Sequence, residues 1–338
     1  MKPRIAKWDN LKLFLIFCVV AGHFLARIDD NRLAQRMFFF IYLFHMPAFM
    51  FISGLMSTRT IDQKRCAKIF DFLAAFLLTK FVLFLVKVFF THDYSALRLW
   101  EMNDISWYMF ALFVYYFATM VIRKLPAMPM IGAAVVLACL AGYNSHIGTF
   151  LSLSRLICFY PFFLAGYHMD SDFIRHHTIG QPIKILSLLY VLAAAGFTIF
   201  RIDRIWWMTR LLRVKYAYAQ YAQYQRAGAV LRLGWYAGSA LFIIALICFS
   251  SEAETPLTKL GSRTLTVYVL HYIPLYLFYY GMGANSWLPG LHGCAWIALL
   301  AALITTLVLC WKPFTTLVNL WITLPERIVK AIKDKKST

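Results

Sequence analysis

Charged residues are scarce in this sequence of 338 residues, of which only 14% are Asp, Glu, Lys or Arg. An ordinary soluble domain has about 25% charged and roughly 45–50% apolar residues. Here 61% of the residues are hydrophobic and the mean hydropathy is +0.65. The shortage of charge excludes a typical soluble domain and predicts an all-α, polytopic membrane protein. We expect one continuous domain over residues 1–338, because helices packed in lipid share a single body.

Acidic residues are the rarer charged kind, with 15 Asp and Glu against 34 Lys and Arg, and the formal net charge is +19. Such a charge is also typical of nucleic-acid-binding proteins. Basic residues beside membrane spans, however, normally set the orientation of the protein and contact anionic lipid. We therefore expect membrane lipids as partners and no nucleic acid.

The sequence also lacks a CxxC pair and a recognisable signal peptide. Its seven cysteines fall mostly within apolar runs, which favours buried reduced thiols over disulfides or a metal site. The first residues, "MKPRIAKWDNLK", lead directly into an apolar stretch with no small-residue cleavage site after it, so no cleaved leader is expected.

Long hydrophobic runs are what the sequence has in abundance. A transmembrane helix needs about 20 mostly apolar residues, and by that rule we predict about ten spans. They cover approximately residues 11–28, 37–56, 68–90, 106–122, 129–143, 152–168, 183–200, 232–250, 264–281 and 293–311.

The basic residues predict that both termini lie in the cytoplasm. With this orientation most Lys and Arg residues fall on cytoplasmic segments, whereas the outer loops "HDYSALRLWEMND" and "GMGANSWLPGLHG" are poor in them. This distribution follows the positive-inside rule. The cytoplasmic set comprises Lys2, Arg4, Lys7, Lys12, Arg59, Lys64, Arg65, Lys68, Arg123, Lys124, Arg175, Lys184, Lys259, Arg263, Lys312, Arg327, Lys330, Lys333, Lys335 and Lys336.

Residues 201–232 break this pattern, because they carry seven Arg or Lys against one Asp yet fall on the outer side. Either the span count is wrong by one, or the loop is a functional exception. Ile205, Met208 and Leu212 share one helical face, with Arg204 and Arg213 away from them, which predicts an interfacial helix lying along the membrane surface. A binding role is the alternative to an interfacial anchor.

Aromatic residues give two further candidates for contact with a sugar. Tyr216, Tyr218 and Tyr221, with Tyr224, follow the basic half of the loop. Their rings could stack on a sugar while the hydroxyls stay hydrated, or they could belong to an interfacial aromatic belt. Trp107, at the start of "WYMFALF", is a further candidate for substrate binding.

Two histidines lie inside predicted spans. His23 in "CVVAGHFL" and His45 in "FHMPAF" belong to consecutive antiparallel helices, at depths that differ by only about 5 Å. Strongly polar side chains near mid-bilayer tend to face a cavity or a partner, and imidazole suits proton removal from a hydroxyl near neutral pH. We predict that the pair borders one reaction site. The alternative is that each histidine only bonds a neighbouring helix.

Other polar residues suggest a site for an anionic donor at the cytoplasmic mouth. Asp9 is about 21 Å from His23 along a straight helix, which excludes direct pairing. We place Asp9, Lys12, Arg59, Arg65 and Lys68 at this mouth, where the cations could bind phosphates or simply set the topology. His271 is near mid-membrane and could line the donor path, or serve packing. Lys80 is too deep to reach either surface easily, which predicts an acidic partner that the sequence does not identify.

Several motifs are similar to those of a known family. "WDNLKLFLIFCVVAGHF" and "FHMPAFMFISGLMS" resemble the opening landmarks of the integral membrane acyltransferase 3 family, particularly the branch related to fucose 4-O-acetylases. "WYMFALF", "YPFFLAGY" and "GSRTLTVYVLHY" are weaker echoes of it. The family often carries Arg-x-x-Arg at the start of its third helix. The nearest match here ends in Lys68, which keeps the charge but lacks the planar guanidinium.

The resemblance implies a multi-pass enzyme of the bacterial inner membrane. It would move an acetyl group from cytoplasmic acetyl-CoA to a hydroxyl of a cell-surface glycan or exopolysaccharide, or of its lipid-linked precursor. His23 would be the general base, and His45 or Ser53 could stabilise the oxyanion. Direct transfer and an acyl-histidine relay both remain open. The enzyme would act alone or with other polysaccharide-biosynthesis membrane proteins.

Two other functions compete with an enzyme. A secondary transporter or exporter of a sugar or acyl-linked solute would also use polar residues at mid-membrane, although the two halves of the chain show no evident repeat. A glycan-export scaffold without chemistry is the third possibility, and for it the histidines would be dispensable.

Overall fold

The computed structural model describes residues 5–28, 30–57, 63–94, 98–148, 150–177, 180–324 and 327. Within these ranges the chain is helical, with no strand and one isolated bridge between Glu101 and Phe150. Short 3₁₀ turns and one π-helical turn connect parts of it. The α-helices are α1 (Ala6–Leu25), α2 (Arg32–Tyr42), α3 (His45–Leu55), α4 (Gln63–Thr91), α5 (Trp107–Ile122), α6 (Ala127–Ala141), α7 (Leu153–His168), α8 (Ser171–His177), α9 (Gln181–Ile205), α10 (Thr209–Arg213), α11 (Gly228–Phe249), α12 (Thr264–Leu270), α13 (Tyr272–Tyr276), α14 (Ala284–Trp287), α15 (Cys294–Leu309) and α16 (Lys312–Ile322).

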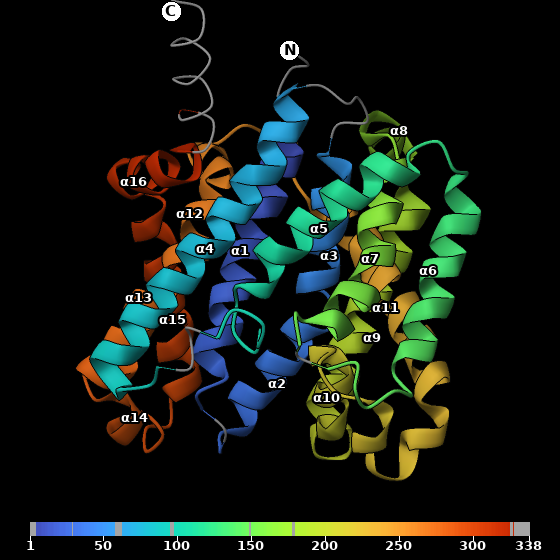
Figure 1. Ribbon diagram of the computed structural model, residues 1–338. Coiled ribbons are helices and arrows are strands. Elements are labelled where there is room, and N and C mark those ends of the chain that lie inside the picture. Colours follow the sequence, from blue (N-terminus) through green and yellow to red (C-terminus); the bar gives the residue numbers. More distant parts are fainter. Residues whose placement is uncertain are drawn as a thin grey trace, which may run out of the picture.

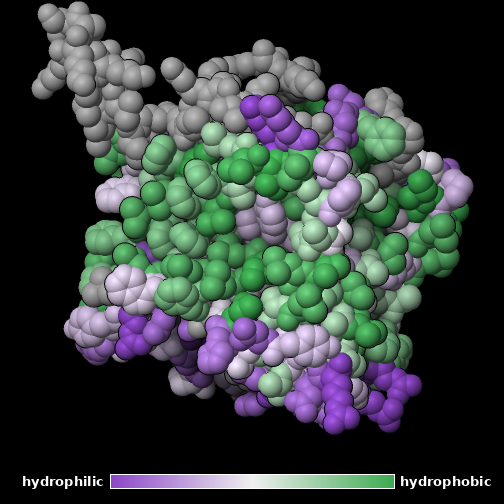
Figure 2. All heavy atoms as spheres, turned by 45° about the vertical axis from the view of Figure 1, so that its right-hand side comes forward, coloured by the Kyte–Doolittle hydropathy of each residue, from purple (hydrophilic) through white to green (hydrophobic). Residues whose placement is uncertain are grey.

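The long helices form a bundle whose outer surface is apolar. They run up and down one axis, so that the start of α1 and the helix α16 lie at the same end (Figure 1). A band of hydrophobic residues crosses the face in Figure 2, between more hydrophilic ends. Outward-facing Phe89, Met128 and Phe200 are 78%, 80% and 83% exposed. Apolar exposure on this scale indicates contact with lipid, as the composition predicts.

Each predicted span coincides with a helix or a run of helices. Not every one of these helices, however, is long and apolar enough to cross a membrane by itself. Among the residues that the structure describes, five helical stretches are long and apolar enough to cross a membrane, namely Ala6–Leu25, Arg32–Leu55, Lys68–Thr91, Gln181–Arg213 and Gln223–Phe249. A sixth crossing arises if α15 and α16, bent by 67°, form one broken span. The all-α membrane fold is confirmed, whereas the count of ten and the cytoplasmic termini stay predictions.

The basic segment after α9 differs from its prediction. Residues 201–213 continue α9 within the stretch Gln181–Arg213, rather than forming a separate helix along the surface. Ile205 and Leu212 are buried, because they pack into the bundle. The segment lies at the opposite end of the bundle from the start of α1, where Figure 1 places α10. The segment therefore lies at the end of the bundle at which the span count predicts it.

Pro47 interrupts the second membrane crossing between α2 and α3. Proline has no N–H to donate to the carbonyl four residues earlier, so the carbonyl of Leu43 loses its helical partner. The Ser239 hydroxyl of α11 donates to this carbonyl at 3.1 Å. The break also allows His45 Nδ1 to bond the Ile41 carbonyl at 2.8 Å. The proline therefore fixes the direction of the His45 ring.

A non-helical segment, residues 98–106, fills the lower half of the bundle beside α5. Since α5 has 16 residues, it is only about 24 Å long, less than the hydrocarbon thickness of about 30 Å. Backbone at this depth is tolerated only where protein satisfies it. The Trp100 carbonyl accepts from the Leu151 N–H at 2.7 Å, and the Met102 carbonyl accepts from the Ser152 hydroxyl at 3.2 Å. The segment is thereby held against the start of α7.

Two glycines bring α3 and α7 into backbone contact. A Cβ added at Gly54 would overlap the carbonyl of Phe163, and one added at Gly166 would overlap the carbonyl of Phe51. Small residues allow membrane helices to approach this closely and to gain packing energy. The crossing explains the glycines of "FISGLMS" and "FFLAGY" and fixes His45 relative to α7.

Substitution of either crossing glycine by alanine is expected to destabilise the protein. Gly54→Ala and Gly166→Ala would force the helices apart and lower the free energy of unfolding by about 1–3 kcal/mol. Gly234→Ala on α11, where an added Cβ meets nothing within 4 Å, is the matched control and should be neutral or slightly stabilising. Thermal unfolding in detergent measures the difference. Equal melting temperatures for all three variants would contradict the proposed close crossing.

Candidate active site

His23 and His45 line one cavity of about 200 Å³ in the half of the bundle away from the start of α1. His23 comes from the last turn of α1, and His45 from the first turn of α3. The shared cavity was the geometry predicted from their depths, and their catalytic roles stay predictions. Polar residues from five further parts of the chain complete the wall: Tyr42, Asn103, Asp104, Arg155, Arg213, Lys215, Tyr268 and Tyr272.

The His23 imidazole contacts an aromatic cluster behind it. Its ring centroid lies 5.3 Å from those of both His271 and Tyr272. The Tyr272 hydroxyl is 3.4 Å from His23 Nδ1. His23 is only partly buried, so one edge of the ring faces the cavity while the other edge is held by Tyr272.

His45 has a fixed orientation. Its Nδ1–H donates to the Ile41 carbonyl at 2.8 Å, and its ring packs edge-on against Tyr42 with centroids 4.6 Å apart. This assignment of the tautomer follows from the carbonyl, which can only accept. The lone pair of Nε2 is consequently available on the cavity side.

His271 lies behind His23 and does not line this cavity or the donor-side cavity described below. It is fully buried, and its Nδ1 bonds the carbonyls of Tyr268 at 2.8 Å and Val267 at 3.1 Å. Its contacts favour the packing alternative over a place on a donor path. The reason is the break between α12 and α13, which turns the imidazole back onto its own helix. His271 supports the His23 ring instead.

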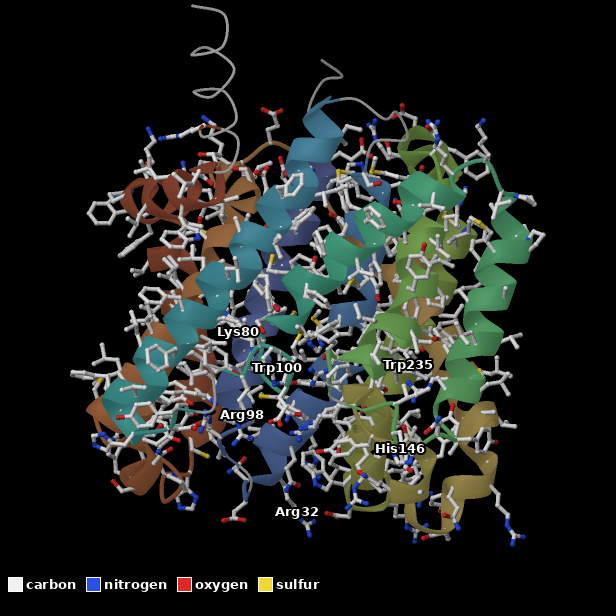
Figure 3. All side chains as sticks on the ribbon, viewed as in Figure 1. Arg32, Lys80, Arg98, Trp100, His146 and Trp235 are labelled. Carbon is white, nitrogen blue, oxygen red and sulfur yellow. The ribbon has the colours of Figure 1, made fainter. Side chains whose placement is uncertain are left out.

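The predicted partner of Lys80 is Asp104. Lys80 Nζ lies 2.8 Å from Asp104 Oδ2, and the lysine side chain is 4% exposed. Figure 3 shows Lys80 on α4, close to the segment that carries Arg98 and Trp100. Lys80 also donates to the carbonyls of Arg98 at 3.2 Å and Glu101 at 3.4 Å. One ammonium group therefore anchors the segment that supplies Asn103 and Asp104 to the cavity.

Arg155 is a site residue that the sequence reading missed. It lines the cavity from α7, donates to the Met102 carbonyl at 3.1 Å and stacks over the Trp107 ring at 5.1 Å. A charged residue inside the predicted span 152–168 was the available signal, because such residues usually face a cavity. Trp107 also lines the cavity, and its predicted role in substrate binding stays a prediction.

Arg213 and Lys215 bring two further positive charges to the cavity wall. Arg213 lies over the Phe38 ring at 5.1 Å, and Lys215 over the Tyr216 ring at 5.1 Å. Partial burial works to raise the pKa of the Tyr216 hydroxyl, but the charges and hydrogen bonds of Lys215 and Arg213 outweigh burial and hold that pKa below its ordinary value. Tyr216 thus lies beside two positive charges, which favour its ionised form.

Two of the tyrosines predicted to stack on a sugar are buried in the protein. Tyr218 and Tyr221 are 1% and 0% exposed. The Tyr218 ring fills the space beside Gly142 and Gly228, where an added Cβ would overlap it. Tyr221 accepts from Arg232 at 3.3 Å. Neither ring offers a free face, so the stacking role is corrected to one of packing.

A second cavity of about 200 Å³ lies toward the end of the bundle where α1 begins. Lys12 and Lys68 line it, as do the Ser53 and Tyr108 hydroxyls, which lie 2.8 Å apart. Lys12 pairs with buried Asp9 at 2.7 Å. Arg59 lies outside the described residues, as does the side chain of Arg65.

Tyr268 separates the two cavities. Among the described residues it is the one that lines both. Its hydroxyl donates to the Ile105 carbonyl, so the ring is tied to the segment that Lys80 anchors. The two cavities therefore approach each other at this side chain.

The six described cysteines are buried and form no disulfide with one another. Within the described part of the chain, His, Cys, Asp and Glu form no group of three that could hold a metal ion.

Removal of the Lys80 charge is expected to destabilise the protein strongly. Lys80→Met would leave the Asp104 carboxylate without its counter-ion, which costs about 3–5 kcal/mol for a buried pair. Lys80→Met with Asp104→Asn should recover part of this loss. Lys87→Met on the same helix, whose more exposed partner is Asp93, should cost about 1 kcal/mol or less. Thermal unfolding in detergent compares them, and equal losses for Lys80→Met and Lys87→Met would refute the anchoring role.

Comparison with known proteins gives one match. Residues 5–314 match the model of the acyltransferase 3 family, described as an acyltransferase domain. No curated protein and no solved structure matches the chain. The family match covers nearly all the described helices and both cavities, and the chain belongs to the acyltransferase 3 family of membrane acyltransferases.

Proposed function

We propose that this membrane acyltransferase moves an acetyl group from cytoplasmic acetyl-CoA to a hydroxyl of an extracytoplasmic glycan. The acceptor would be a cell-surface glycan or exopolysaccharide, or its lipid-linked precursor, at the inner membrane of a bacterium. One observation carries the proposal: a lysine-lined cavity and a histidine-lined cavity approach from opposite ends of the bundle and meet at Tyr268. A thioester and an alcohol on opposite sides of a membrane require such an arrangement.

The donor side suits an anionic thioester. Lys12 and Lys68 lie on the wall of its cavity, where ammonium groups can pair with phosphates of the acetyl-CoA. Below them the wall is apolar, with Ile16, Phe49 and Phe72 among its members. The acetyl thioester would extend down this apolar channel toward Tyr268, shielded from water.

The acceptor side supplies the base. With Nδ1–H of His23 donating to the Tyr272 oxygen, Nε2 can take the proton of the attacking hydroxyl. The alkoxide oxygen then bonds the thioester carbonyl carbon, the carbonyl oxygen becomes an oxyanion, and the carbon–sulfur bond breaks to release the thiolate of CoA. The proton on His23 neutralises that thiolate. Tyr272 lies on the same wall and, because it accepts from His23, keeps its own O–H, which can donate to the oxyanion.

Loss of the proposed base is expected to remove most of the transfer. In membranes supplied with radiolabelled acetyl-CoA and a crude glycan acceptor, His23→Ala should lower the transfer rate by about 10² to 10⁴-fold. His45→Ala should have a milder effect. His146→Ala, an exposed histidine labelled at the lower end of Figure 3, is the matched control and should keep full activity.

The same assay separates the enzyme from its rivals. A secondary transporter or exporter would redistribute solute without leaving covalent label on an acceptor. An export scaffold would be insensitive to all three histidine variants. Full transfer by well-folded His23→Ala protein would remove the proposed base.

Truncation of Tyr268 is expected to open the partition between the cavities. In a variant without native cysteines, Ser53→Cys should react with an impermeant thiol reagent only from the end where α1 begins. Asn103→Cys should react only from the opposite end. Adding Tyr268→Ala should make both positions reactive from either side, whereas Tyr268→Phe keeps the ring and the one-sided pattern. One-sided labelling in the Tyr268→Ala background would show that another barrier separates the cavities.

A further inference from the structure

Three cations line the cavity of the two histidines, which is the acceptor cavity of the proposed function. None of the three forms an ion pair with a carboxylate of the described residues. Arg155, Arg213 and Lys215 are on the wall of this cavity. Among the described residues, no acidic group lies within ion-pair distance of any of them. The carboxylate on the same wall, Asp104, is held by Lys80 at 2.8 Å. The cavity therefore carries a net positive charge beside the two histidines.

The usual reason for basic residues beside a span does not apply to these three. Exposed Arg201, Arg204, Arg210 and Arg226 of the same segment can reach lipid headgroups. Arg155, Arg213 and Lys215 face a protein cavity instead. Charge that faces a cavity inside a membrane protein is typically retained where it meets a partner.

The backbone between two of the cations is strained in a way that places both on one wall. Val214 has φ of 55° and is 0% exposed. The left-handed region is unfavourable for a β-branched residue. The Ser154 hydroxyl donates to the Val214 carbonyl at 2.8 Å, which holds the turn. Because the chain reverses its twist here, Arg213 and Lys215 both reach the cavity although only one residue separates them.

We infer that the acceptor saccharide carries an anionic group, a carboxylate or a phosphoryl group, which Arg155, Arg213 and Lys215 bind while its hydroxyl faces His23. The inference rests on the proposed function and specifies its acceptor. The guanidinium and ammonium groups on this wall can form hydrogen-bonded ion pairs with an anionic group of the acceptor. A neutral sugar has no negative charge with which to form such pairs. The same positive wall would stabilise the oxyanion of the transfer.

Transfer to matched acceptors tests this inference. Purified protein in nanodiscs of neutral lipid receives radiolabelled acetyl-CoA and one of four acceptors. These are an oligosaccharide of glucuronic acid, its carboxyl-reduced form, a polyprenyl-diphosphate-linked hexose, and a neutral alkyl glycoside of that hexose. Comparison of the glucuronic acid oligosaccharide with its carboxyl-reduced form tests recognition of a carboxylate. Comparison of the diphosphate-linked hexose with the neutral alkyl glycoside tests recognition of a phosphoryl group. Wild-type protein should prefer at least one anionic acceptor over its neutral counterpart.

The double variant Arg213→Gln with Lys215→Gln should raise KM for the preferred anionic acceptor by about 10-fold or more per charge removed. KM for acetyl-CoA should change little and the preference for the anionic over the neutral acceptor should be lost, while kcat falls with both acceptors because the oxyanion loses the same two charges. Arg204→Gln with Arg226→Gln removes two charges from the exposed part of the segment and is the matched control, with no change expected. Equal use of charged and neutral acceptors by wild type, or a selective rise in KM for acetyl-CoA, would overturn the inference.

Equilibrium binding without acetyl-CoA separates this inference from the proposed function. If no acceptor is acetylated but wild type binds an anionic saccharide more tightly than the Arg213→Gln, Lys215→Gln variant does, the anionic site stands and the proposed reaction falls. If no acceptor is acetylated and the two proteins bind charged and neutral saccharides alike, both fall.

Discussion

Polar backbone at mid-membrane depth has no water to bond, and this constraint shapes most of the site. Part of the segment 98–106 turns its carbonyls into the bundle, and those carbonyls need a partner from the protein. Lys80 satisfies those of Arg98 and Glu101, and Arg155 satisfies that of Met102. These donors are charged, and their burial is favourable only because several acceptors converge on them. These bonds hold the segment in the position from which Asn103, Asp104 and Ile105 line the cavity.

The same constraint explains why two of the histidines lie where helices break. A break releases carbonyls from the helical ladder, and the imidazole N–H of the next residue can take one of them. His45 bonds the carbonyl of Ile41 at the α2–α3 break, and His271 bonds that of Tyr268 at the α12–α13 break. Each histidine thereby stabilises a bent helix, and the bend in turn fixes its tautomer and direction. Structural and chemical roles are therefore not alternatives for His45.

The sequence was most informative where the signal was local. Apolar run length predicted the helices, and the depths of His23 and His45 placed them beside each other, because both depend only on rise per residue. The anomalous depth of Lys80 predicted an acidic partner without identifying it. Asp104 lies in an irregular segment, whose path depends on tertiary hydrogen bonds that no periodicity reveals.

Predictions that required knowledge of the packing were less successful. Tyr218 and Tyr221 were expected at the surface because they follow a basic loop, but the glycines at 142 and 228 open a space that the Tyr218 ring fills. His271 was placed on a donor path from its depth alone, yet its helix turns it toward its own carbonyls. Depth can be predicted from the chain, whereas the rotation of a side chain about the helix axis depends on its neighbours.

The distribution of charge between the cavities bears on the chemistry itself. With the anionic acceptor inferred above, both substrates of the proposed reaction would be anionic, so two binding sites of positive sign would be expected at opposite ends of the bundle, with the reacting carbonyl between them. The transfer generates first an oxyanion and then a thiolate, and each gains from the positive potential of Arg155 and Arg213 in a region with little water to screen it. A buried cation without a counter-ion destabilises the protein when no substrate is bound. The negative charge of the substrate and of the transition state would offset this cost. Neutral residues in these positions would make a more stable bundle and a weaker catalyst, which is why the strained turn at Val214 is more simply explained by the reaction than by the fold.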